Sequence, residues 1–218
     1  MSCRHLTVII GILLAASSCL AQGVFLEKGT SAPFIDFGFA TEEEVYLFGL
    51  SVGFSAGGVF DFGVGGVYGG DNHSSVGGFS QFAAINFLRA TNAESSRFSL
   101  SFTQSVTSLG RLGTKYGNST TDVSLGGRAV LQVGRSKTAV APFAGFARTG
   151  LASTTRDVNV YEFGIAIVNF SHRSVIVVTP TISTGGEITS FALSFTLNLL
   201  GGGGSSSGGK WKDGEDSD

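Results

Sequence analysis

Apolar residues alternate with small or polar residues along most of the chain. In segment 45–54, aromatic and aliphatic residues occupy every even position, from Tyr46 to Phe54. The same alternation of two residue classes recurs in segments 96–107 and 188–199. A period of two places successive side chains on opposite faces of a strand, so the pattern indicates strands with one apolar face and one small, hydrophilic face.

The alternation predicts ten strands, and all but the first span ten residues or more. A typical strand has about 5 to 6 residues, whereas a tilted strand needs about 9 to 11 to cross a bilayer. The predicted strands therefore have the length of membrane-spanning strands. They cover residues 34–40, 45–54, 58–68, 77–88, 96–107, 122–133, 138–149, 157–168, 174–183 and 188–199.

Composition separates a membrane barrel from a soluble sandwich or lipid-carrying barrel. The 218 residues include 33 Gly and 19 Phe, and only 14% are charged. A soluble barrel needs charges on its outer face, but here the face opposite the aromatic residues carries mainly Gly, Ser, Thr and Ala. A sheet spans hydrocarbon only when it closes and pairs every backbone group. We therefore predict an all-β fold, a closed antiparallel up-and-down transmembrane barrel of about ten strands, with eight as the alternative.

The first residues have the order of an export signal. Arg4 and His5 precede the uncharged run 6–16, and a stretch of small residues follows. We expect a signal peptide over 1–21, with cleavage after Ala21; lipidation at Cys19 is the alternative. The remaining chain is expected to comprise an N-terminal periplasmic segment (22–33), the barrel (34–200) and a disordered, acidic tail rich in Gly and Ser (201–218).

The links between the strands suggest an orientation. With a periplasmic N-terminus, the links expected in the periplasm are 55–57, 89–95, 134–137 and 169–173, and those expected outside include 69–76, 108–121 and 150–156. Outer-membrane barrels have short periplasmic turns and longer outer loops. In this orientation Tyr46, Tyr68 and Tyr161 fall on the lipid face at the outer rim, as an aromatic girdle would.

The residues that fall on the lumen face by parity include the charged residues Asp36, Asp61, Arg128 and Glu162. Because a buried charge is costly unless it is paired, we expect partners among them. Arg128 and Glu162 lie at similar depth on strands separated by one other strand, so we predict that they pair across the lumen. The pair would serve as a structural salt bridge or as a constriction.

The export signal, the ten alternating strands and the apolar final strand resemble the small outer-membrane β-barrel proteins of Gram-negative bacteria, the opacity-type and porin-like superfamily. Phe191, Leu193, Phe195 and Leu197 match the family's alternating last strand, but Leu199 stands where an aromatic residue is usual. The eighteen residues of the tail, 201–218, follow the barrel. The resemblance implies outer-membrane lipid, lipopolysaccharide and the barrel assembly machinery as partners. No nucleic acid is expected, because the chain is near neutral and has no basic patch.

Three function classes stay open at this point. The first is a structural or surface-interaction barrel, the second a narrow passive channel, and the third a lipid-modifying enzyme at the membrane rim. After the expected signal the chain has only His73 and His172 and no cysteine, so we expect no catalytic residues, no metal site and no cofactor. Small lumen residues such as Gly49 and Ser51 favour a channel, and the lumen charges favour a closed barrel.

Overall fold

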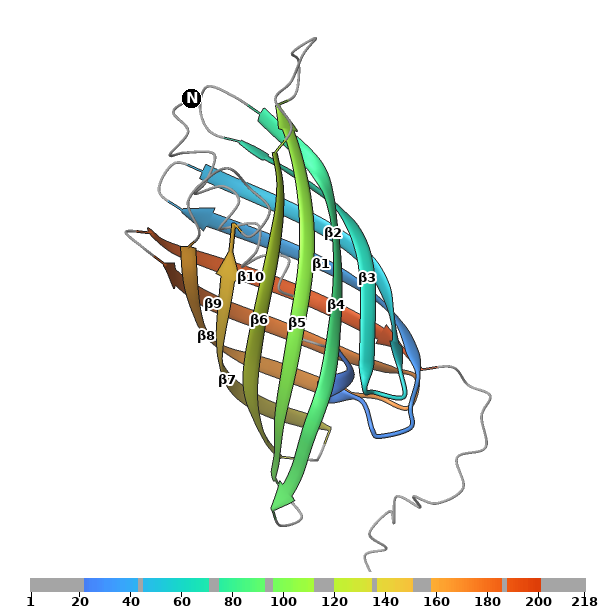
Figure 1. Ribbon diagram of the computed structural model, residues 1–218. Coiled ribbons are helices and arrows are strands. Elements are labelled where there is room, and N and C mark those ends of the chain that lie inside the picture. Colours follow the sequence, from blue (N-terminus) through green and yellow to red (C-terminus); the bar gives the residue numbers. More distant parts are fainter. Residues whose placement is uncertain are drawn as a thin grey trace, which may run out of the picture.

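The computed structural model describes residues 22–42, 45–70, 75–92, 96–111, 120–134, 137–150, 158–185 and 188–200. They form one closed antiparallel barrel of ten strands (Figure 1). The strands are β1 (Ala32–Glu42), β2 (Val45–Ala56), β3 (Phe60–Gly70), β4 (Ser75–Asn92), β5 (Ser96–Arg111), β6 (Thr120–Val133), β7 (Thr138–Thr149), β8 (Val158–Phe170), β9 (Ser174–Gly185) and β10 (Ile188–Leu199). A short 3-10 helix, η1 (Gln22–Phe25), precedes them. The predicted fold class is confirmed.

Each strand pairs with its neighbours in sequence, and β1 closes the ring by pairing with β10. At that closure Phe37 stands opposite Phe195. Closure leaves no free sheet edge, which is the condition for a sheet in hydrocarbon. Within the described residues, no helix is long and apolar enough to cross a membrane.

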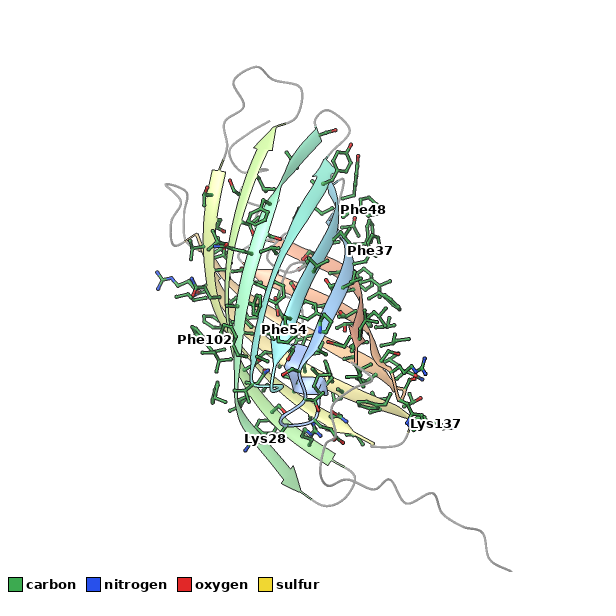
Figure 2. All side chains as sticks on the ribbon, turned by 90° about the vertical axis from the view of Figure 1, so that its right-hand side faces the viewer. Lys28, Phe37, Phe48, Phe54, Phe102 and Lys137 are labelled. Atoms are coloured by element: carbon green, nitrogen blue, oxygen red, sulfur yellow. The ribbon has the colours of Figure 1, made fainter. Side chains whose placement is uncertain are left out.

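The outer face of the barrel is apolar. Phe37, Phe48 and Phe102 project outward from three strands (Figure 2) and are 49%, 41% and 45% exposed. Among the strand side chains that the structure describes, Arg148, next to the last residue of β7, is the charged residue of this face. Large contiguous apolar surfaces are rare on soluble monomers. The outer face therefore has the character of a lipid-facing surface, as the alternation predicted.

The two ends of the barrel differ. We call "near end" the end that holds η1 and the links 57–59, 93–95, 134–137 and 171–173, and "far end" the opposite one. The far end holds the two longest gaps between strands, 112–119 and 150–157, but also the two shortest, 43–44 and 186–187. The expected link 89–95 is shorter than predicted, because β4 continues to Asn92 past an irregularity between Asn86 and Leu88.

The hydrophobic core lies inside the barrel, toward the near end. Its wall is formed by inward residues of β7, β8 and β9, which are apolar on both faces in this part of the sheet. We call this set the apolar wall: Ala139, Ala141, Phe143, Ala166, Val168, Val175 and Val177. Outer-membrane barrels usually have polar interiors, so the apolar wall needs an apolar group to cover it.

Candidate functional site in the barrel lumen

The N-terminal segment of the described chain supplies that group. Val24, Phe25 and Leu26 are buried and belong to the same core cluster as the apolar wall. We call residues 22–26 the plug. Sequence analysis assigned 22–33 to the periplasm, whereas the structure places the plug inside the barrel and begins β1 at Ala32. The physical reason is that the apolar wall buries three consecutive apolar side chains that the periplasm would leave in water.

Asp61 holds the start of the plug from the opposite side of the lumen. The Gly23 N–H donates to both carboxylate oxygens of Asp61, each at 3.0 Å. Asn86 on β4 donates from its amide nitrogen to Asp61 Oδ2 at 3.2 Å and to the Gly58 carbonyl at 3.3 Å. Asp61 is fully buried. This lumen carboxylate therefore binds the backbone of the chain's own N-terminal segment.

Arg97 on β5 holds the other end of the plug. Its Nη1 donates to the Val24 carbonyl at 3.4 Å and to the Leu26 carbonyl at 3.2 Å. The 3-10 turn itself is closed by the Leu26 N–H, which donates to the Gly23 carbonyl at 3.2 Å. A guanidinium has several donors in a fixed geometry, so one side chain can bind two carbonyls at the end of a turn.

Residues 27–31, which we call the strap, connect the plug to β1. Gly29 has φ +91°, a conformation that side chains rarely adopt, and its N–H donates to the Gly57 carbonyl at 2.9 Å. The Gly57 N–H in turn donates to Ser31 Oγ at 2.9 Å. The strap is thereby fixed to the β2–β3 turn, and it leads the chain from the plug in the lumen to the start of β1 in the wall.

Arg128 and Glu162 form an ion pair in the lumen. The register places Arg128 opposite Gly145, and Gly145 opposite Glu162, so all three residues stand level on β6, β7 and β8. A Cβ at Gly145 would lie 3.1 Å from Glu162 Oε2 and 3.4 Å from Arg128 Nε. The two side chains therefore meet directly over Gly145, along one wall of the lumen.

Phe143 connects this pair with the apolar wall. The Arg128 guanidinium lies over the Phe143 ring, 5.0 Å from its centroid. The ring itself lies over Gly164 on β8, where a Cβ would come within 2.5 Å of Phe143 Cζ. Gly145 and Gly164 thus leave the space that the pair and the ring occupy.

The other two lumen carboxylates that sequence analysis predicted have different partners. Asp36 on β1 accepts a hydrogen bond from Thr196 Oγ1 on β10, and both side chains are buried. Asp61 contacts the plug, as described above. The structure therefore brings Arg128 and Glu162 together and places Asp36 and Asp61 in separate contacts.

Tyr46, Tyr68 and Tyr161 all point outward, and each lies within a few residues of the far end of its strand. Tyr46 packs against Phe48 with ring centroids 6.0 Å apart, and Tyr161 against Phe146 at 5.5 Å. The three tyrosines thus lie near the far end of the outer face, and amphipathic rings prefer a membrane interface.

Several expected sites lie outside the described residues: Cys19, the cleavage site at Ala21, His73 and the tail 201–218. His172 is described and lies exposed in the turn between β8 and β9. In the part of the chain that the structure describes, no group of three or more His, Cys, Asp or Glu residues could hold a metal ion.

No protein-family model matches the chain, and no curated protein matches its sequence. Solved structures match its fold. The translocator domain of the autotransporter NalP from Neisseria meningitidis has 13% identity and a TM-score of 0.53, over 91% of this chain and 98% of that one. The N-terminal β-barrel domain of Pseudomonas aeruginosa OprF has 10% identity and a TM-score of 0.38, over 77% and 96%. LpxR from Salmonella typhimurium has 10% identity and a TM-score of 0.43, over 79% and 84%.

The closed ring of long strands, the apolar outer face and the similarity of fold to the NalP translocator domain define the class. The chain is a closed ten-stranded β-barrel with the apolar outer surface of a transmembrane barrel.

Proposed function

We propose that this barrel is closed by its own N-terminal segment and acts as a structural or surface-interaction component of the outer membrane. The observation that carries the proposal is the seating of Val24, Phe25 and Leu26 against the apolar wall inside the lumen. A passive channel needs a continuous water path from end to end. Apolar side chains packed across the near end interrupt that path, which leaves the loops of the far end as the surface for partners.

The Arg128–Glu162 pair is a structural element in this proposal. It lies along the β7 wall over Gly145, so it braces three neighbouring strands rather than crossing the lumen. The plug, not the ion pair, is the element that closes the barrel.

We place the near end in the periplasm and the far end outside the cell. Supporting this, the near-end links are all short, and the two longest gaps between strands are at the far end. A cysteine at Asn118, in the gap 112–119, should react with a membrane-impermeant maleimide on intact cells. The matched variant Ser171→Cys, in the near-end turn, should react only after the cells are broken, and the reverse result would invert the orientation.

We also propose that the protein is not an enzyme. His172 is exposed in a near-end turn, and catalysis by nucleophile, base and orienting group requires side chains held together by rigid elements. Lipid hydrolysis and acyl transfer assays on the purified protein should give background rates. Activity above background that is lost in His73→Ala would contradict this proposal.

The direct test is single-channel recording of the full chain in planar bilayers, with a known porin as the positive control. We expect the baseline current without regular steps. Regular steps of one amplitude from the intact protein would show that the lumen is open and that the protein is a passive channel.

A further inference from the structure

We propose that the near-end lumen is a binding site for a short apolar peptide, and that the plug is its releasable ligand. The inference rests on the proposed closure of the barrel and adds the chemistry of the closing site. Asp61 and Arg97 would form hydrogen bonds with the peptide backbone, and Asn86 would hold Asp61 in place. The apolar wall would bind the peptide's side chains.

The two sides of the site recognise different parts of a peptide. Asp61 accepts the N–H that begins the turn, and Arg97 donates to the carbonyls that end it. Neither contact depends on the side chains of the plug. The apolar wall selects for consecutive apolar residues, because burying such side chains is the main favourable term in binding. The site therefore fits a turn of three apolar residues.

The plug can leave without breaking the barrel. Its contacts with the strands are hydrogen bonds and side-chain packing. The closed ring consists of pairs of neighbouring strands, and residues 22–26 belong to none of these strands. The strap joins it to β1 through Gly29, and the strap's bonds to the β2–β3 turn are Gly29 N–H to Gly57 and Gly57 N–H to Ser31. Release therefore exposes the apolar wall and opens the near end while the sheet stays paired.

The position of Gly23 allows the plug to be displaced by one substitution outside the barrel strands. A Cβ at Gly23 would lie 2.7 Å from Asn86 Nδ2 and from Asp61 Oδ1, and 2.9 Å from the Gly58 carbonyl carbon. Gly23→Leu should therefore push the plug out of the site. Lys28→Leu is the matched control, because Lys28 is exposed on the strap at the near end (Figure 2).

In planar bilayers we expect regular conductance steps from the full chain with Gly23→Leu and none from the wild type or from Lys28→Leu. A synthetic peptide with the sequence of residues 22–31, added on the near-end side, should suppress the steps. The same peptide with Phe25 and Leu26 replaced by serine should not. Trypsin cleavage after Lys28 should be faster in Gly23→Leu than in the wild type, as an independent report of release.

The outcomes separate this inference from the proposed closure. Steps from the wild type would overturn the closure itself. A wild type and a Gly23→Leu variant that both stay closed, with faster cleavage after Lys28 in the variant, would leave closure standing and overturn the plug as its cause. Steps that both peptides suppress equally would overturn the apolar recognition. If Gly23→Leu fails to fold, as judged by loss of heat-modifiable gel mobility, the triple change of Val24, Phe25 and Leu26 to serine makes the same test.

Discussion

The lumen has two regions, and their inner faces differ in chemistry. Toward the near end, β7, β8 and β9 present Ala, Val and Phe to the interior, and the plug covers them. One level farther along the same strands, Gly145 and Glu162 replace the apolar residues, and Arg128 joins them from β6. The outer face of these strands is apolar in both regions. The residue types of the outer face therefore match the lipid around it in both regions. The residue types of the inner face change with the group that fills the lumen at each level.

This difference assigns separate tasks to the two regions. The plug closes the barrel through apolar packing and backbone hydrogen bonds, which can form and break while the sheet stays intact. The Arg128–Glu162 pair links β6 and β8 over β7, so it stabilises the wall itself. Changes in the first region should affect conductance, and changes in the second should affect mainly the free energy of unfolding.

The largest loss of stability is expected from breaking the ion pair. The two side chains are 4% and 5% exposed, so Arg128→Ala leaves a buried carboxylate without its guanidinium and should cost about 3 to 5 kcal/mol. Glu162→Ala should cost a similar amount, and the double variant much less than the sum. Urea unfolding from lipid vesicles measures the three free energies of unfolding, and a double-mutant cycle gives their coupling.

A coupling below about 0.5 kcal/mol would show that the pair contributes nothing as a unit. Conductance of these variants should stay at the baseline, because the pair lies along the wall. Steps in either single variant would instead make the pair the constriction.

Phe143 contacts both regions, so its variants can separate what core packing and the contact with Arg128 each contribute to the free energy of unfolding. Phe143→Ala removes the ring from the core cluster and from below Arg128, and should cost about 3 to 5 kcal/mol. Phe143→Leu keeps an apolar side chain but loses the cation–π contact, worth about 0.5 to 2 kcal/mol. Unfolding of each variant alone and combined with Arg128→Ala checks this. An equal effect of Phe143→Leu with and without Arg128 would mean that the ring acts only through packing.

The fold follows from the sequence more fully than the site does. Alternation identified all ten strands, and counting depth along 122–133 and 157–168 identified Arg128 and Glu162 as level. The plug was not predicted, because three apolar residues carry no period and gave no reason to leave the periplasm. A signal for it exists in the loss of alternation at 165–168 and 175–178, where both faces are apolar. That pattern indicates an inner wall covered by an apolar group, but the sequence does not say which segment covers it.

Arginine placed on each face of one strand tests which face meets the lipid. Leu50 is 57% exposed at the middle of β2, so Leu50→Arg should cost about 2 to 4 kcal/mol at the bilayer midplane. Gly49→Arg is the matched control on the inner face, where a Cβ meets nothing closer than the Gly66 carbonyl oxygen at 4.0 Å. Unfolding from vesicles should show a much smaller loss for Gly49→Arg, and equal losses would mean that the two faces are misassigned.

The smallest predicted effect concerns Asp36, the carboxylate with a hydroxyl partner rather than a guanidinium. Thr196→Val preserves the shape of the side chain but removes the hydrogen bond from Thr196 Oγ1 to Asp36, and should cost about 1 to 2 kcal/mol. Thr189→Val on the same strand is the control. Thr189 is exposed, and its hydroxyl lies 3.4 Å from that of Thr184, so its loss should stay within about 0.5 kcal/mol. Urea unfolding from vesicles of one lipid composition measures the free energies of unfolding of Thr196→Val and Thr189→Val. Because Thr196→Val removes a neutral hydroxyl donor and Arg128→Ala removes a guanidinium, the loss should be smaller than that of Arg128→Ala. A loss as large as that of Arg128→Ala would show that the Thr196 hydroxyl does for Asp36 what a full positive charge does for Glu162.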